Sequence, residues 1–553
     1  MDGRTLRHRS LVTLAVLMLL AAGGWLAFDR YIIYLPGLIQ DYRDPIGPNR
    51  EVTWSAGPAT AEARGELPNI VLIVADDLGW NDITLHGGVA SGTVPTPNID
   101  RIAREGVQLT RAYAASATCA PSRAALMTGR YPTRFGFEFT PMPTGMPMIV
   151  RRAQRRQPQE PPFLFHESDR RIPEFADMGL PADEIALPEL LDGAGYHSVL
   201  IGKWHLGASN GSDPRSQGFD ESLELAGLLY GPAGDPDLVE ARQDFDPLDE
   251  VFWAIGRAAV REGTGPRFAP DGYLTDYFSR EAVRVIEANR NRPFFLYLAH
   301  WAPHTPLQAT AEDYAALSHI EDHGLRVYGA MIRALDRGVG QVLDALDTHG
   351  LADNTIVIFT SDNGGAHYVG LPDINHPLRG WKATFFDGGV RVPTFMRWPA
   401  MIAPGSTLNS LASQVDLLPT LAAVAGVESP GDRVLDGHNL LPQLTSSQQE
   451  APPRTLFWRS GHYRAVIDGD WKLQVSDRPE QVRLFDLASD PRERNDLAAE
   501  RPDRVTALLE LLAAHTAEQA EPLWPSIVEM PVNVDTPLGR PPNEDDEHVY
   551  WPN

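Results

Sequence analysis

The chain has 553 residues, of which 43% are hydrophobic and 22% charged, and its formal net charge is −25. This composition is typical of a globular protein and excludes a disordered or fibrous one. The acidic balance argues against nucleic-acid binding, which depends on clustered lysine and arginine. Cys119 is the single cysteine, so an intramolecular disulfide, a multi-cysteine zinc site and an iron–sulfur cluster are excluded.

The N-terminus has the pattern of an export signal. Three arginines precede residues 10–28, a run of 19 residues without charge. About 20 apolar residues span a bilayer, whereas the apolar part of a secretory signal is usually shorter. Basic residues before the run place the N-terminus in the cytoplasm. We therefore predict a signal anchor over residues 1–30 and an extracytoplasmic protein that faces the periplasm. The alternative is a cleaved signal peptide that releases the protein into the periplasm.

Strand-like runs alternate with helical patterns after a predicted linker over residues 31–66. The runs typical of buried strands cover residues 69–75, 197–201, 294–299 and 355–360. The helical patterns cover residues 96–106, 185–195, 275–289, 330–349 and 413–426. Strands that alternate with helices indicate a parallel sheet. We predict an α/β fold over residues 67–453, with a large, mixed, mostly parallel sheet sandwiched by helices.

The alternation of strand-like and helical segments ends near residue 454. Four short strand-like runs follow, at residues 455–458, 463–467, 471–475 and 483–487, and a helical pattern covers residues 504–517. We predict a C-terminal subdomain over residues 454–521, formed by a small antiparallel sheet and one helix. Residues 522–553 are predicted to be a Pro-rich, acidic tail along the surface. Two irregular insertions, at residues 141–174 and 230–271, interrupt the main domain.

Polar side chains follow each of the four buried strands. In chain order they are Asp76, Asp77, Lys203, His205, His304, Asp362 and Asn363. The carboxyl ends of parallel strands meet at one edge of the sheet, where ligands bind. Any one of these residues alone is explained as a loop cap or a solvated side chain. Four strands that deliver such residues to one edge indicate a functional site.

The three carboxylates and the amide in this set suit a hard divalent cation. Ca²⁺ takes such oxygen ligands readily, and Mg²⁺ also binds them but keeps more water. Two adjacent acids, Asp76 and Asp77, repel each other unless a positive charge lies between them. A turn cap is the alternative for this pair. The ligand types alone do not separate Ca²⁺ from Mg²⁺.

The segment around Cys119 is the most specific motif in the sequence. It reads TCAPSRAALMTGR over residues 118–130. Pro121 suits a first helical turn and Gly129 suits the position just after a helix. Cys119 is therefore expected at the start of a short helix, where free N–H groups favour an anion, with Arg123 one turn further on. A buried, inert cysteine is the alternative.

With these motifs the sequence resembles the type I sulfatases of the alkaline phosphatase superfamily. The resemblance rests on Cys119-Ala-Pro-Ser-Arg123 with Leu126-Met-Thr-Gly-Arg130, and on Gly202-Lys-Trp-His-Leu-Gly207. It rests further on Ser361-Asp-Asn-Gly-Gly365 and on Leu378-Arg-Gly-Trp-Lys382, which leads to Gly388-Gly-Val-Arg-Val-Pro393. It extends over most of residues 69–500 and implies an alkaline phosphatase-like fold.

The resemblance implies that a separate maturation enzyme oxidises Cys119 to Cα-formylglycine. The hydrate of this aldehyde would be the nucleophile: one of its oxygens attacks sulfur and the alcohol leaves. The second hydroxyl would then lose its proton and expel sulfate, which restores the aldehyde. A serine or a thiol lacks this second hydroxyl, which explains why the modified residue is needed.

The resemblance also assigns roles to the polar residues. It implies one Ca²⁺ held by Asp76, Asp77, Asp362 and Asn363, with modified residue 119 completing the shell. Arg123 would hold the hydrate, Lys203 and Lys382 would clamp the sulfate oxygens, His205 would orient or deprotonate the hydrate, and His304 would protonate the leaving oxygen. A solvated surface lysine is the alternative for Lys382.

Some residues depart from the family pattern, and others near the motifs are not assigned a role in the site. Asp387 stands where many relatives have glutamate and receives no catalytic role. Trp381 replaces a residue that is often glycine, which would narrow the site. His300 and His367 lie near motif ends and are interpreted as structural. The basic cluster at residues 151–156 is interpreted as a rim for anionic substrates, a contact for lipid headgroups, or a solvated loop.

The expected function is therefore hydrolysis of aryl or carbohydrate sulfate monoesters to alcohol and sulfate. A phosphonate or phosphate monoester hydrolase on the same scaffold is the nearest alternative, because lysine and calcium clamps suit both oxyanions. A catalytically silent, membrane-tethered binding protein is an alternative of another class. The expected partners are a sulfate ester, the maturation enzyme and, through an uncleaved N-terminal segment, the membrane; no nucleic acid is expected.

Overall fold

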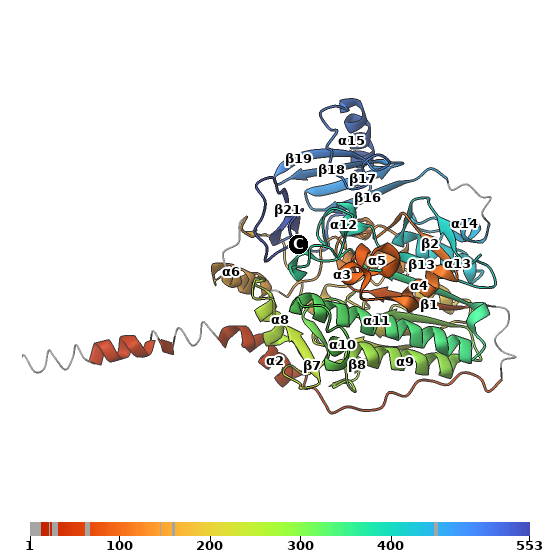
Figure 1. Ribbon diagram of the computed structural model, residues 1–553, viewed down its shortest axis with the longest axis horizontal. Coiled ribbons are helices and arrows are strands. Elements are labelled where there is room, and N and C mark those ends of the chain that lie inside the picture. The colour runs from red at the N-terminus through yellow and green to blue at the C-terminus, as the bar shows by residue number, and fades with distance from the viewer. Residues whose placement is uncertain are drawn as a thin grey trace, which may run out of the picture.

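A computed structural model shows how these segments are arranged (Figure 1). It describes residues 13–21, 23–24, 31–60, 67–143, 145–156, 161–446 and 452–553. Within these residues no helix is both long enough and apolar enough to cross a membrane. The predicted signal anchor over residues 1–30 lies largely outside the described residues.

A ten-stranded mixed sheet forms the centre of the molecule, as the sequence predicts. Its strands, in spatial order, are β14 (Ser406–Leu408), β2 (Val107–Leu109), β13 (Thr394–Arg397), β12 (Thr355–Ser361), β1 (Asn69–Ala75), β10 (Phe294–Ala299), β5 (His197–Gly202), β6 (Glu221–Leu225), β8 (Val260–Glu262) and β9 (Arg267–Phe268). The five strands from β12 to β6 are parallel to one another. Antiparallel strands occur only outside this central group.

Helices cover both faces of the sheet because its central strands are apolar on both sides. In β1, Val71 and Ile73 point to one core, and Leu72 and Val74 point to the other. The first core is closed by α4 (Pro97–Arg104), α9 (Leu274–Asn289) and α11 (His323–Thr348). The second is closed by α5 (Cys119–Thr128), α7 (Leu187–Asp192) and α13 (Leu417–Val424). This is the predicted α/β sandwich.

The C-terminal part contains the predicted antiparallel sheet and helix. The sheet has the order β16 (Thr455–Ser460), β17 (Tyr463–Asp468), β18 (Trp471–Asp477) and β19 (Glu480–Asp486). Helix α15 (Pro502–Ala517) packs on it through Leu508 and Leu512. Figure 1 shows this layer above the main domain.

The tail is more ordered than expected. Strands β20 (Val528–Asn533) and β21 (His548–Pro552) pair with each other, and β20 also pairs with β4 (Leu164–Phe165) from the first insertion. The prediction of a surface tail is therefore corrected, because Val532, Val549 and Trp551 are buried in the main core.

The insertions and the predicted linker also contain regular elements. The first insertion holds α6 (Met146–Arg156), and the second holds β7 (Leu238–Ala241), α8 (Asp249–Ile255), β8 and β9. Strand β7 pairs with β11 (Leu307–Thr310). Residues 31–66 contain the helices η1 (Ile32–Tyr34) and α2 (Leu35–Arg43), which lie against α8.

The remaining elements are short. They are η3 (Trp80–Asp82), η4 (Thr84–His86), α3 (Val89–Gly92), β3 (Ala112–Tyr113), η5 (Pro132–Phe135), η6 (Phe175–Asp177), α10 (Ala311–Ala316), η7 (Ala352–Asn354), η8 (His367–Val369), α12 (Asp387–Val390), β15 (Ala412–Ser413), η9 (Gln414–Asp416) and α14 (Leu441–Thr445).

Candidate active site

The carboxyl ends of four neighbouring strands form the floor of the site. Strands β12, β1, β10 and β5 lie side by side in parallel, with Ala75 opposite Ser361 and Ala299 opposite Gly202. The residues that follow these ends are the predicted ones: Asp76, Asp77, Lys203, His205, His304, Asp362 and Asn363. Hydrogen bonds and ion pairs, some of them through Cys119 and Arg123, join all of these residues except His205 into one connected cluster.

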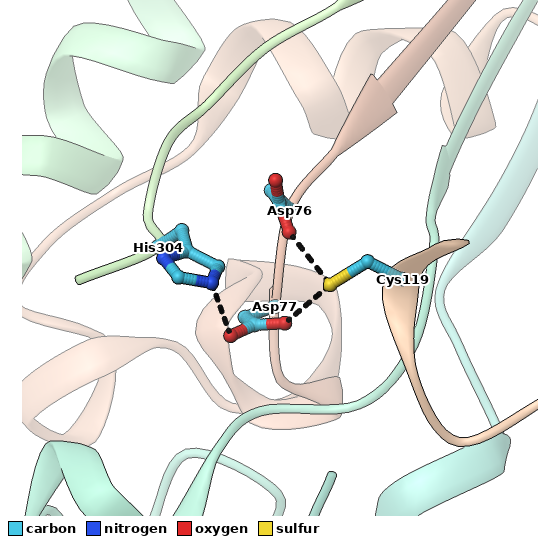
Figure 2. Close-up of side chains that lie close together, drawn as sticks. All are labelled: Asp76, Asp77, Cys119 and His304. Carbon is cyan, nitrogen blue, oxygen red and sulfur yellow. Dashed lines mark hydrogen bonds and ion pairs between the residues drawn. The ribbon is translucent and has the colours of Figure 1, made fainter. Parts of the chain in front are cut away.

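Cys119 lies at the start of α5 and points at the two acids of β1 (Figure 2). Its Sγ is 3.4 Å from Asp76 Oδ1 and 3.6 Å from Asp77 Oδ1. Lys382 Nζ lies 3.3 Å from the same sulfur. The helix ends as predicted, with Gly129 in the left-handed conformation at φ 67°. The predicted helix start therefore delivers Cys119 to the sheet edge.

Three basic side chains surround the three acids. Arg123 donates from Nε and Nη2 to Asp362 Oδ2, at 3.0 and 2.8 Å, and from Nη1 to the Lys203 carbonyl. Lys203 Nζ is 2.6 Å from Asp76 Oδ2. Lys382 Nζ is 2.8 Å from Asp77 Oδ2. Lys382 is therefore buried within the site, and the alternative of a solvated surface lysine is wrong.

The backbone is strained at this edge. Asp77 and His205 adopt φ angles of 61° and 62°, in the left-handed region that residues with a side chain seldom occupy. Such conformations cost of order 1–3 kcal/mol and persist where the surrounding structure imposes them, often at active sites. Here both strained residues lie in the loops that follow the ends of β1 and β5.

His304 approaches the acids from the loop after β10. Its Nε2 is 3.5 Å from Asp77 Oδ2, and Figure 2 draws this contact as a dashed line. Its Nδ1 is 2.6 Å from the Thr305 carbonyl oxygen. Because a carbonyl only accepts, Nδ1 carries a proton and donates it. Burial lowers the pKa of His304 to about 3, against the opposing effect of Asp77. The ring is thus neutral with Nε2 free to accept a proton.

The pKa values of the acids differ because their neighbours differ. Burial and the nearby Asp362 raise the pKa of Asp76 to about 7, against Lys203 and Arg123. Burial would also raise the pKa of Asp77, but Lys382 and the other cations hold it well below its usual range. Burial and the carboxylates of Asp362 and Asp76 raise the pKa of the Cys119 thiol. This is the reverse of the electropositive setting that activates a cysteine as a thiolate.

The donor set fits a divalent cation. Ligand atoms of Asp76, Asp77, Cys119 and His304 lie within 4.8 Å of one another. Asn363 donates its amide N–H to Asp77 Oδ1 at 2.8 Å, while its buried Oδ1 has no hydrogen-bond partner in the described part of the chain. An unpaired buried oxygen beside three buried carboxylates is the arrangement that a hard cation would satisfy.

Other singled-out residues lie outside this cluster of contacts. His300 is buried on the side of α11, where a Cβ added at Gly338 would lie 3.8 Å from its ring. The His367 backbone carbonyl accepts from Leu538. Asp387 is buried and pairs with Lys472, at 2.8 Å. Trp381 belongs to the main hydrophobic core.

Three aromatic residues at the site were not singled out from the sequence. Tyr368 donates to Asp77 Oδ2 at 2.9 Å and lies 3.0 Å from Lys382 Nζ. Trp301 stacks on His304 with ring centroids 4.0 Å apart, and Lys203 Nζ lies 4.7 Å from its centroid. Tyr297 lies 3.3 Å from Arg123 Nη1. Tyr297 had a usable signal, since it is the polar residue within the apolar run of β10.

Comparisons with known proteins identify the family of the chain. Residues 68–427 match the family model described as sulfatase, and residues 380–517 match that of the N-sulphoglucosamine sulphohydrolase C-terminal region. Mouse (Mus musculus) steryl-sulfatase is 32% identical over 84% of this chain and 84% of its own length. Mouse N-acetylgalactosamine-6-sulfatase is 35% identical over 74% of this chain and 72% of its own.

Solved structures share this fold over 82–83% of the chain. The crystal structure of Ps i-CgsB in complex with k-i-k-neocarrahexaose is 31% identical, with a TM-score of 0.67, and covers 83% of this chain and 94% of that one. The PsFucS1 sulfatase from Pseudoalteromonas sp. is 25% identical, with a TM-score of 0.64, over 82% of this chain and 91% of that one. The chain belongs to the sulfatase family and is a sulfuric ester hydrolase.

Proposed function

We propose that the protein is a formylglycine- and Ca²⁺-dependent sulfatase that hydrolyses aryl or carbohydrate sulfate monoesters outside the cytoplasm. The observation that carries this proposal is the position of Cys119. It lies at the start of α5, within 3.6 Å of both acids of β1 and 3.3 Å of Lys382. The residue that the maturation enzyme would oxidise therefore lies where the acids and cations meet.

The cation would be held by the acids and the amide of the sheet edge, namely Asp76, Asp77, Asp362, Asn363 and modified residue 119. The ion supplies a positive charge that polarises a sulfuryl oxygen. Without it the three acids are matched by three basic side chains, Arg123, Lys203 and Lys382. A divalent ion would leave the site with an excess of positive charge, which suits an anionic sulfate ester.

The protein's own side chains position the reacting groups. The formylglycine hydrate supplies a nucleophile that is regenerated after each turnover. Arg123, fixed by Asp362, would hold this hydrate, and His205 would orient it or take its proton. Lys203 and Lys382 would bind the sulfate oxygens and stabilise charge that develops on them.

His304 would deliver the proton to the leaving oxygen. Nδ1 is committed to the Thr305 carbonyl, so the transferable proton would be on Nε2 of the cationic ring. Burial keeps the ring neutral in the free site and the Asp77 carboxylate opposes this, so the ring would take up its proton only when the substrate is bound. A bound sulfate ester would add further negative charge on the same side. Trp301, stacked on the ring, would hold its plane while the proton is transferred.

The test of this function is the mass of the tryptic peptide over residues 112–123, from protein made in its native host. We expect an aldehyde in place of the Cys119 thiol. Recombinant protein made without a maturation enzyme serves as the control and should show the thiol. An unmodified thiol in native protein would remove the nucleophile from the proposal. The substrate class is tested separately, by comparing the rates at which the protein hydrolyses an aryl sulfate and an aryl phosphonate. Faster hydrolysis of the phosphonate would contradict the proposed sulfate ester substrate.

Calcium binding gives a prediction that does not require turnover. Adding Ca²⁺ to chelator-treated protein should raise its thermal unfolding temperature, because an ion at 100 times its Kd stabilises the folded state by about 2.7 kcal/mol. Asp362→Asn should lose most of this response. Asp82→Asn is the matched control, since Asp82 is a buried acid bonded instead to Gly79 and Tyr328. Equal responses in both variants would contradict the ligand set.

A further inference from the structure

Helix α2 is turned the opposite way from an ordinary surface helix. Its polar side faces the protein, where Asp41 pairs with Arg257 at 2.8 Å and Asp44 pairs with Arg261 and the buried Arg267. Gly37 lies so close to α8 that an added Cβ would be 3.1 Å from Ile255 Cα. The orientation is therefore fixed by ion pairs and by close packing.

The apolar side of this segment faces outward. Its members follow helical spacing of three or four residues, and they are Tyr31, Tyr34, Leu35, Leu38 and Tyr42, with Ile39 beside them. Tyr31 is 63% exposed, Leu38 59% and Tyr42 89%. Helices of globular proteins normally bury such a stripe and expose their charges. We call this set the α2 stripe.

Helix α6 continues the same flank of the molecule. Figure 1 shows α6, α8 and α2 together on the side where the N-terminal segment leaves the domain. Ile149 of α6 packs on the small cluster formed by Ile33, Val251 and Ala254, which ties α6 to η1 and α8. Met148 is 68% exposed, and Arg151 is exposed as well. Helix α6, which packs against η1 and α8, therefore exposes apolar and basic side chains on the same flank as the stripe.

We propose that the α2 stripe docks into the interfacial region of a membrane, with the basic side of α6 against anionic headgroups. Tyrosine is well suited to this region because its ring is apolar and its hydroxyl stays in water. The stripe begins three residues after the uncharged run at residues 10–28. The occupant is therefore a lipid surface, which the chain would already meet through the signal anchor predicted over residues 1–30, and the local basic residues oppose the overall charge of −25.

The consequence is a fixed orientation of the catalytic domain rather than free movement on a tether. The ion pairs of Asp41 and Asp44 join the docked helix to the sheet edge at β8 and β9. Docking would hold this edge at the membrane, whereas α15 at the top of Figure 1 stays in water. Neither step depends on formylglycine or on turnover.

Lipid quenching of a single fluorophore tests this. The full chain carries one other cysteine, Cys119, which is buried, so a Tyr42→Cys variant takes a label at one accessible position. The labelled protein is reconstituted in vesicles of phosphatidylethanolamine and phosphatidylglycerol that contain a lipid with a nitroxide near the headgroup. Two exposed positions are the controls. Asn49→Cys lies seven residues further along the chain, outside the α2 stripe, and Leu509→Cys lies on α15.

We expect severalfold stronger quenching at position 42 than at positions 49 and 509. A Met148→Cys label should also be quenched, less so in vesicles without phosphatidylglycerol, and the Leu38→Asp/Tyr42→Asp background should abolish this. Equal quenching at 42 and 49 would reduce docking to tethering and overturn the proposal. A label at 42 that becomes shielded without lipid as the protein concentration rises would instead assign the stripe to a second copy of the chain. Aryl sulfate turnover of the same samples reports separately on the catalytic proposal.

Discussion

Replacing Cys119 with alanine is expected to lower kcat for an aryl sulfate by about 10⁴-fold or more, as loss of the nucleophile does in other covalent hydrolases. The change removes one heavy atom from a buried position, namely Sγ of the cysteine or the aldehyde oxygen of the modified residue. It leaves in place the acids and cations around it, so binding of the ester through Lys203 and Lys382 should persist. We therefore expect KM to change far less than kcat. Steady-state kinetics on purified, metal-loaded protein give both values.

A Cys119→Ser variant separates the nucleophile from simple loss of a polar atom. Serine retains one oxygen at this position but has no second hydroxyl, so sustained turnover should also be lost. Unchanged thermal unfolding temperatures in both variants would show that the fold is intact. Wild-type turnover in the alanine variant would refute Cys119 as the source of the nucleophile. Wild-type turnover in the serine variant would refute the need for an aldehyde hydrate.

The sequence predicted the strand-end part of the site because topology alone brings those residues together. Asp76 and Asp362 follow strands that pair directly, with Ala75 opposite Ser361. A run that is apolar and β-branched on both faces can only be buried in a sheet covered on both sides. Once those runs are identified as parallel strands, the meeting of their polar ends follows from geometry.

The contributions of side-chain packing were not predictable in this way. Tyr368 reaches Asp77 from the short helix η8, whose position depends on contacts with distant parts of the chain, including Gln243, which donates to the Tyr368 carbonyl. Trp301 holds His304 through a stack that no spacing rule encodes. Helix α2 lies within the segment predicted to be a linker, residues 31–66, and it contains Pro36 and Gly37. Proline in the first turn is compatible with a helix, and the close approach to α8 explains the glycine.

A buried ionic cluster joins the C-terminal sheet to the loop that carries Lys382. Lys472 of β18 is fully buried and lies 2.8 Å from Asp387 Oδ1 and 2.9 Å from Glu493 Oε1. The Asp387 backbone N–H donates to Glu493 Oε2 at 2.6 Å. Arg379, at the other end of the same loop, donates to the Glu493 carbonyl at 3.0 Å. The loop that carries Lys382 is therefore held at both ends by the C-terminal part.

Replacing Lys472 with methionine should lower the free energy of unfolding by about 3–5 kcal/mol, because it leaves two buried carboxylates without their main cation. Methionine keeps most of the volume, so the loss reports on charge rather than on a cavity. Arg464→Met is the matched control: Arg464 lies on neighbouring β17, is half-buried, and pairs with the exposed Asp477 at 3.6 Å. Such a pair is worth about 0–1 kcal/mol. Urea unfolding followed by tryptophan fluorescence measures both changes.

The pH dependence of this loss fixes its electrostatic origin. Burial already raises the pKa of Glu493 to about 7. Burial also acts to raise the pKa of Asp387, but Lys472, Arg391 and the Tyr113 hydroxyl together outweigh it and lower that pKa. Without Lys472 both folded-state pKa values should rise above the ordinary 4.5 and 3.8. A carboxyl whose pKa is raised in the folded state makes the protein less stable as pH rises through that pKa. The loss of unfolding free energy in Lys472→Met should therefore be larger at about pH 8 than at about pH 5. Adding Asp387→Asn and Glu493→Gln to Lys472→Met should recover much of the stability at pH 8. A deficit that is independent of pH, and that these neutral partners do not reduce, would instead assign the role of Lys472 to packing.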